Sequence, residues 1–282
     1  MDSSLLFGIT TFTYLFSTIL YAAIFIFKSN RLGPTATIFT IIAFLVQTVG
    51  IGLRWLESYQ MGIGRAPLTN MYESMVFFSW TVILIYLLIE WKFKTRIIGA
   101  FAVPFAFVAM AWASFSTEFT KEIAPLVPAL QSNWLIAHVV TCFIGYAAFA
   151  ICAGLGIMYL IKNTSESRQS TDKSTLLGSL PPLKVIDDIT HKTMVFGFLW
   201  LSIGIITGAI WANSAWGTYW SWDPKETWSL ITWFIYAITL HARHTRGWGG
   251  TRIAWLAILG FIGVMFTYYG VNFWLSGLHS YG

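Results

Sequence analysis

Long apolar segments alternate with short polar ones along the whole chain. Crossing a hydrocarbon layer of about 30 Å takes roughly 20 apolar residues in a helix, and eight segments come close to that length. They lie at about residues 5–27, 35–53, 71–91, 97–115, 133–161, 194–212, 224–240 and 253–275. The pattern predicts an all-α polytopic membrane protein with about eight transmembrane helices, forming a single membrane domain over residues 1–282.

Composition supports a membrane protein and excludes several other classes. The chain is 56% hydrophobic and 10% charged, whereas a soluble domain carries about a quarter charged residues. Its net charge of +5 comes from basic residues in short loops, so nucleic acid is not an expected partner, and membrane lipid is. Cys142 and Cys152 lie in one apolar segment, roughly 15 Å apart along a helix, which excludes a disulfide within it.

Basic residues indicate the orientation of the chain. Thirteen of the 17 Lys and Arg residues follow the first, third, fifth and seventh segments, so these loops are predicted to be cytoplasmic. Both termini and the tryptophan-rich loop at 213–226 then face the outer, periplasmic or lumenal, side. The polar connection at 162–190 is predicted to be cytoplasmic, and no chemistry is assigned to it. His191 follows it directly and is interpreted as a loop residue.

One polar stretch concentrates aromatic side chains. Residues 216–228 contain four Trp and one Tyr, and an aromatic surface of this kind suits a flat apolar ligand. Asp223 is a good N-cap, Pro224 suits the first helical position, and Glu226 completes a capping box, so a helix is predicted to begin at Pro224. The alternative is an aromatic belt at the membrane interface, but belts scatter their rings over many helix ends.

The predicted topology places three histidines at different ends of the membrane domain. His138 lies near the outer end of the fifth segment and His279 follows the last segment, so both are expected beside the tryptophan-rich loop. Neutral imidazoles next to an aromatic surface suit haem iron, although a lone His is more often a hydrogen-bonded polar residue. His241 is predicted near the cytoplasmic end of its helix, either as a functional group or as part of an inner-surface charge cluster.

Two further motifs predict local structure. Residues 65–73 include Asn70 and Glu73 at capping-box spacing, which by itself indicates only the start of a helix. Gly204 and Gly208, with the glycines at 260 and 263, allow helices to approach closely. Both motifs are therefore interpreted as packing and capping signals.

The tryptophan-rich stretch resembles a known signature. Trp-Gly-x-x-Trp-x-Trp-Asp at 216–223 is similar to the motif of haem-handling membrane proteins of cytochrome c maturation. Its continuation at 224–228, together with 240–243 and 277–281, resembles the CcsA (ResC) component of the System II cytochrome c synthase. The resemblance covers about residues 60–282.

The resemblance implies functional residues. Haem b is the implied substrate and bound ligand, with His138 and His279 as catalytic residues and iron ligands and His241 as an inner iron ligand, for which His244 is the alternative. Arg65 is implied as a contact of a haem propionate. The remaining implied haem contacts are Trp216, Gly217, Trp220, Trp222, Asp223 and Trp228. For Asp223 the helix cap and the haem contact both stay open.

The resemblance also implies partners and an activity. The chain is expected to export haem and present it for covalent attachment to Cys-x-x-Cys-His motifs of apocytochrome c, as a haem lyase component active only with a CcsB (ResB)-type subunit. The expected location is a bacterial plasma (inner) membrane, with a thylakoid membrane as the alternative. Two other functions stay open: a haem carrier without lyase activity, and a haem b electron-transfer subunit.

Overall fold

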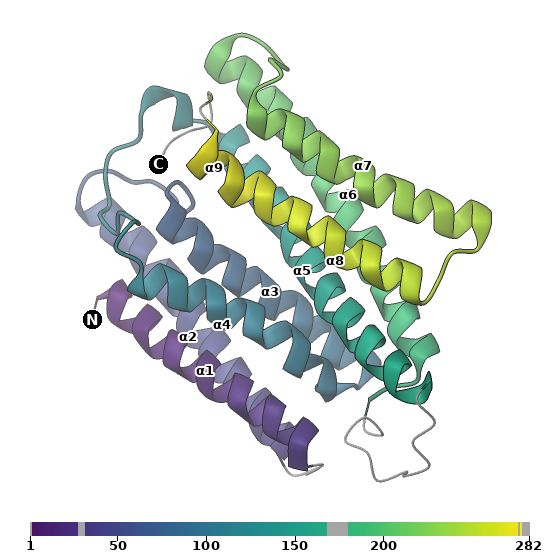
Figure 1. The fold of residues 1–282 in the computed structure, drawn as a ribbon. Coiled ribbons are helices and arrows are strands. Elements are labelled where there is room, and N and C mark those ends of the chain that lie inside the picture. The colour runs from purple at the N-terminus through teal and green to yellow at the C-terminus, as the bar shows by residue number, and fades with distance from the viewer. Residues whose placement is uncertain (1, 28–31, 168–179, 276, 278–282) are drawn as a thin grey trace.

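The computed structural model describes residues 2–27, 32–167, 180–275 and 277, and this part of the chain forms helices and no strands. Its long helices follow one another in an up-and-down bundle (Figure 1). Their bounds are α1 Ser3–Phe27, α2 Leu32–Gln60, α3 Met71–Phe93, α4 Gly99–Phe115, α5 Asn133–Ser167, α6 Leu183–Trp216, α7 Pro224–Arg246 and α8 Thr251–Met265. Short helical segments complete them: η1 Arg96–Ile98, η2 Pro128–Leu130, the π-helical η4 Phe266–Gly270 and α9 Val271–Trp274.

Seven segments of the described chain are long and apolar enough to cross a membrane. They include every predicted transmembrane segment except the seventh, because α7 carries Lys225 and Glu226 at its start and Arg243 and Arg246 at its end. Nevertheless, α7 runs beside α8 from one end of the bundle to the other, and α1 begins at the end where α9 finishes (Figure 1). The path of the chain therefore agrees with an even number of crossings.

Several helices extend beyond the predicted apolar segments. Helix α5 continues to Ser167 and α6 begins at Leu183, so both ends of the predicted polar connection are helical, and His191 lies within α6 and not in a loop. Trp216, predicted in the outer loop, is the last residue of α6. The reason is that hydropathy marks only the part of a helix inside hydrocarbon, whereas hydrogen bonding continues into the polar surroundings.

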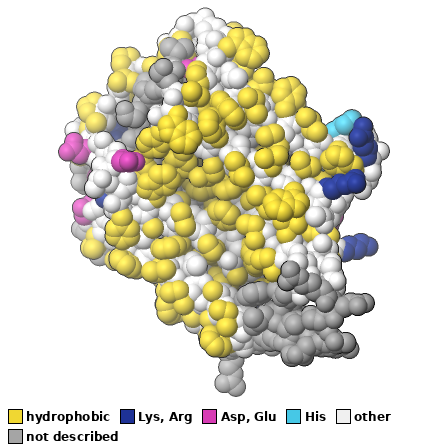
Figure 2. Space-filling model, viewed as in Figure 1, with side chains coloured by type: hydrophobic (Ala, Val, Ile, Leu, Met, Phe, Trp, Pro, Cys, Tyr) yellow, Lys and Arg dark blue, Asp and Glu magenta, His cyan; other side chains and the backbone are white. Residues whose placement is uncertain are grey.

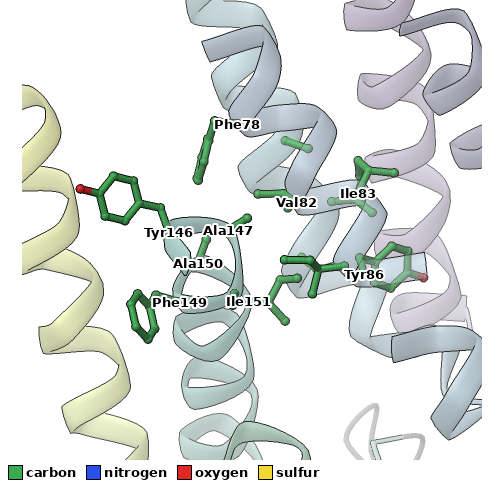
Figure 3. Close-up of a cluster of buried hydrophobic side chains, with 14 of the residues drawn as sticks. Phe78, Val82, Ile83, Tyr86, Tyr146, Ala147, Phe149, Ala150 and Ile151 are labelled. Atoms are coloured by element: carbon green, nitrogen blue, oxygen red, sulfur yellow. The ribbon is translucent and has the colours of Figure 1, made fainter. Parts of the chain in front are cut away.

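Helix α5 is the central element and packs against α3, α4, α6 and α8. Figure 3 shows Phe78 and Val82 of α3 facing Ala147 and Ala150 of α5 across a tightly packed, apolar interface. A Cβ atom added at Gly154 would collide with the carbonyl oxygen of Phe101 in α4. The small residues of α5 thus let neighbouring helices approach its backbone.

The glycines of α8 confirm the packing predicted for them. A Cβ atom at Gly260 would lie 2.5 Å from the ring of Tyr236 in α7, and one at Gly263 would lie 3.2 Å from Thr232 Oγ1. The Tyr236 ring, held in this space, stacks on Phe149 of α5 with centroids 3.5 Å apart. Helix α7 is thereby joined to the bundle despite its low hydropathy.

The surface matches a membrane protein. Figure 2 shows hydrophobic side chains over the middle of one face, with basic and histidine side chains where α7 meets α8 and acidic side chains at the opposite edge. Exposed apolar residues along α1 and α2 continue this surface, and they include Phe12, Ile19, Ile38 and Leu45. An apolar band between two polar edges is what a bilayer requires.

Candidate functional site

A cavity of about 170 Å³ opens among the ends of five elements of the bundle. This is roughly ten times the space that one water molecule needs. Its walls come from the start of α3, the start of α5, the end of α6, the start of α7 with the loop before it, and the segment η4–α9. Lining side chains include His138, Val139, Cys142, Phe143, Tyr146, Ile205, Trp211, Tyr219, Trp220, Lys225, Tyr268 and Asn272.

His138 lies in this cavity with a defined tautomer. Its Nδ1 is 2.7 Å from the carbonyl oxygen of Gly204 in α6, and a carbonyl only accepts, so Nδ1 carries the proton. The Nε2 lone pair is therefore free to bind a metal ion, and a hydrogen bond from the other ring nitrogen is the usual support for a ligating His. Trp211 stacks beside the imidazole, with ring centroids 6.0 Å apart and planes 17° from parallel.

The glycine pair of α6 makes space for this histidine. A Cβ atom at Gly208 would lie 2.6 Å from His138 Nδ1, and one at Gly204 would lie 2.6 Å from Cys142 Sγ. The sequence predicted close helix packing here, and the structure adds that the space is filled by the ring of His138. Gly208 therefore acts as a positioning residue for the imidazole.

Gly208→Ala is expected to displace the His138 ring and weaken haem binding while leaving the fold intact. Alanine favours a helix over glycine by about 1 kcal/mol, so a loss of binding without a loss of thermal stability would report the clash. The measurement is haem content and apparent Tm of the purified protein. Gly52→Ala is the matched control, because nothing lies within 4 Å of an added Cβ there. Unchanged haem content in Gly208→Ala would contradict the positioning role.

The tryptophan-rich loop is only partly directed into the cavity. Gly217 has a φ of 78° and ends α6 by donating its N–H to the carbonyl of Asn213, so its observed role is a helix cap. Trp216 packs on Trp211 with centroids 4.8 Å apart and does not line the cavity. Trp220 lines it, whereas Trp222 has a φ of 60° and a 68% exposed side chain.

The start of α7 confirms the predicted capping box. Asp223 Oδ1 accepts from the N–H of Lys225, and Glu226 Oε2 accepts from the N–H groups of Asp223 and Ser221. Asp223 does not line the cavity, and Trp228 packs against Phe266 of η4 with centroids 4.1 Å apart. The geometry thus shows the structural role of Asp223, and its contact with haem stays a prediction.

Arg65 belongs to a buried cluster behind the cavity wall. Glu73 Oε2 accepts from Arg65 Nη1 at 2.6 Å, and Glu73 Oε1 accepts from Arg54 Nε at 2.9 Å. Arg65 Nε donates to the carbonyl of Ala124, and the residue is 7% exposed. Arg65 is absent from the cavity lining, so its observed role is structural, and its contact with a haem propionate stays a prediction.

The other predicted histidines lie elsewhere. His241 and His244 are exposed near the end of α7 that is remote from the cavity. His279 lies outside the described residues. Within the described ranges no three or more His, Cys, Asp and Glu side chains lie close enough together to hold a metal ion. Iron in the cavity would therefore be held by isolated His side chains.

Two cavity residues were missed at the sequence level. Trp211 meets His138 only because α5 and α6 are antiparallel neighbours, and no spacing in the sequence indicates this. Lys225 lies in the motif continuation at 224–228 and was assigned no role, although a cation directly after an Asp-Pro helix start is a visible signal. Cys142 and Cys152 are free and buried, as expected for small apolar residues.

Fold and site together define an integral membrane protein with an aromatic, histidine-containing cavity at one end of a helix bundle. Residues 68–279 match the family described as Cytochrome C assembly protein. The chain is 41% identical to "Cytochrome c biogenesis protein CcsA" of Guillardia theta, over 98% of this chain and 95% of that protein. It is 38% identical to the protein of the same name from Trieres chinensis, over 100% and 96%. The chain therefore belongs to the cytochrome c assembly family, as a CcsA-type cytochrome c biogenesis protein.

Further similarities agree with this assignment. Identity to the CcsA of Prochlorococcus marinus (strain MIT 9303) is 37%, over 89% of this chain and 85% of that one. The solved structure of "Cytochrome c Heme Lyase CcmF" matches with a TM-score of 0.68 at 16% identity, which shows a shared fold. The match covers 96% of this chain but 48% of that one, so the chain spans about half of its structural neighbour. Its role lies in cytochrome c maturation, in a plasma or thylakoid membrane.

Proposed function

We propose that the chain exports haem and presents it at the cavity for covalent attachment to apocytochrome c, in a complex with a CcsB-type subunit. The observation that carries this proposal is the His138 imidazole, which has a proton-free Nε2 inside a mostly apolar, aromatic cavity. Haem b is the proposed substrate, because its iron accepts an axial imidazole and its porphyrin face favours apolar contact. His279 is proposed as the second ligand, with Trp216, Gly217, Trp222, Asp223 and Trp228 shaping the surrounding surface.

The rim of the cavity suits a protein substrate. Tyr219 and Trp222 are 60% and 68% exposed, so a docking polypeptide finds aromatic side chains beside the bound haem. Each thiol of a Cys-x-x-Cys-His segment would add across a vinyl double bond, with sulfur bonding to the inner carbon and the proton reaching the terminal carbon. This addition needs no oxidant. The protein would contribute orientation of the reactants, an effect worth roughly 7–11 kcal/mol in favourable systems.

The inner half of the proposed path rests on His241. Its position on the exposed surface of α7, remote from the cavity, makes it accessible to a ligand supplied by a neighbouring chain. We propose that it binds haem during entry, with His244 as the alternative ligand one turn further along the helix. A CcsB-type subunit would supply the other axial ligand, because no second His of the described chain is paired with it.

Co-expression with a CcsB-type protein and an apocytochrome, in cells that lack other maturation systems, tests this function. We expect covalent haem on the cytochrome after denaturing electrophoresis, and we expect His279→Ala to abolish it together with the haem spectrum of the purified complex. Haem bound without thioether formation would favour a carrier. A haem that stays bound and cycles between oxidation states during respiration would favour an electron-transfer subunit.

A further inference from the structure

Lys225 places a positive charge in a mostly apolar cavity, whose lining also includes Glu226. It is the one Lys or Arg among the described residues that line the cavity, and it is half-buried. Its Nζ donates to Asn272 Oδ1 of α9 at 2.8 Å and lies 5.9 Å from the ring centre of Tyr268. Both contacts are to neutral groups, so the ammonium is positioned without being neutralised by them.

Nearby carboxylates form no salt bridge with this ammonium, although the charge of Asp223 acts on it at longer range. Within the described chain, no Asp or Glu oxygen lies within 4.0 Å of Lys225 Nζ, although Asp223 and Glu226 are its close neighbours in sequence. Both are engaged with backbone N–H groups at the start of α7, where the positive end of the helix dipole offsets their charge. Glu226 itself lines the cavity, and the remaining titratable groups that line it are His138, Cys142 and three tyrosines, Tyr146, Tyr219 and Tyr268.

An anion would stabilise this half-buried ammonium, whose direct partners are neutral, because even partial burial of an unpaired charge is costly. The oxygen of Asn272 supplies one hydrogen bond, and an ammonium has three donors. The two remaining donors are available to a ligand that fills the cavity. A carboxylate is the chemical group that best matches them, because such charge-assisted hydrogen bonds are among the strongest.

Lys225 and His138 line the same cavity, one on α7 and the other on α5. A ligand that binds iron to His138 and carries carboxylates at its edge would meet both groups. We propose that Lys225 binds a propionate carboxylate of haem and so sets the rotation of the macrocycle in the cavity, with Asn272 as the positioning residue for the ammonium. This assignment rests on the proposed function and gives Lys225 a role of the kind that the resemblance implies for Arg65.

Orientation of the macrocycle matters to the reaction. The two thiols of an apocytochrome approach in a fixed order, so the vinyl edge must face the rim and the propionate edge must face away from it. The apolar contacts of the macrocycle with Trp and Phe are nearly the same in both orientations. A single ionic contact with a propionate therefore decides which edge faces the rim. Lys225 would thus act on specificity as well as on affinity.

Competition between two porphyrins tests the assignment. The full chain, purified with its CcsB-type partner in detergent, is titrated with iron protoporphyrin IX and with its dimethyl ester, in which both carboxylates are blocked. The wild type is expected to favour the free acid by about tenfold or more, as loss of a charged hydrogen bond implies. Lys225→Met is expected to remove most of that preference, and Lys225→Arg to retain it.

Controls separate this role from folding and from the proposed function itself. Lys121→Met removes an exposed charge and should keep the wild-type ratio of the two affinities, and His138→Ala should weaken both porphyrins alike. Asn272→Asp places a carboxylate next to the ammonium and leaves Lys225 itself unmutated. It should reduce the preference for the free acid over the dimethyl ester. A wild-type ratio in Lys225→Met would overturn the assignment alone. Failure of the wild type to bind either porphyrin would overturn the proposed function and the assignment together.

Discussion

His138→Ala should strip the cavity of haem and stop cytochrome c maturation. The substitution removes the only imidazole that lines the cavity in the described part of the chain. Haem affinity is expected to fall by more than the roughly 10- to 100-fold that loss of a ligand's supporting hydrogen bond costs. The measurements are the absorption spectrum of the purified complex and covalent haem on a co-expressed cytochrome.

Rescue distinguishes ligation from a structural role. The substitution removes one hydrogen bond, to the Gly204 carbonyl, which is worth about 0.5–1.5 kcal/mol, so the fold should persist. Added imidazole should then enter the vacated space and restore the haem spectrum. His191→Ala, which removes a histidine of α6 that is absent from the cavity lining, serves as the control. Retention of normal haem content by His138→Ala would refute ligation by this residue.

Glu73→Gln should have the largest effect on stability. The carboxylate of Glu73 pairs with the guanidinium groups of both Arg54 and Arg65, and all three residues are 7% exposed or less. Glutamine would leave two buried cations without a counterion, which typically costs about 3–5 kcal/mol. Thermal unfolding in detergent measures the loss, and Glu118→Gln, at an exposed position, is the control.

Glu73→Gln should also disturb one wall of the cavity. Glu73 also accepts from the N–H of Thr69 at 3.1 Å, and the two arginines bind the carbonyls of Lys121 and Ala124 in the loop before α5. Thr69 lines the cavity, so the cluster holds one of its walls. Haem retention is therefore expected to fall at temperatures where the helices remain folded. If stability and haem retention both match the wild type, the cluster contributes nothing measurable to either.

Membrane helices were predictable because their signal is local. An apolar segment such as 71–91 must form its own backbone hydrogen bonds inside hydrocarbon, so length and hydropathy alone identify it. The start of α7 was equally local, since Asp223, Pro224 and Glu226 act within one turn. Ends such as Ser167 of α5 were missed, because helices continue past the hydrocarbon where hydropathy carries no information.

The site was only partly predictable, since its members come from separate helices. The concentration of Trp identified the loop before α7, and His138 followed from its place at the outer end of α5. Nothing in the spacing indicates that Trp211 stacks on His138 or that Lys225 points to Asn272. Nor does the sequence indicate that Arg65 is enclosed with Glu73, because the ion pair depends on how the segment before α3 folds onto that helix.

By itself the sequence determined the all-helical membrane class, the start of α7 and the cytochrome c assembly family, because hydropathy, capping and motif spacing act over a few neighbouring residues. Tertiary structure alone decided which side chains share the cavity and which nitrogen of His138 carries the proton. It also decided that Arg65 is paired with Glu73 and that Lys225 lines the cavity. These properties depend on how α5 packs against α6 and how α7 packs against α9. Such contacts join residues far apart in the chain, and no local pattern encodes them.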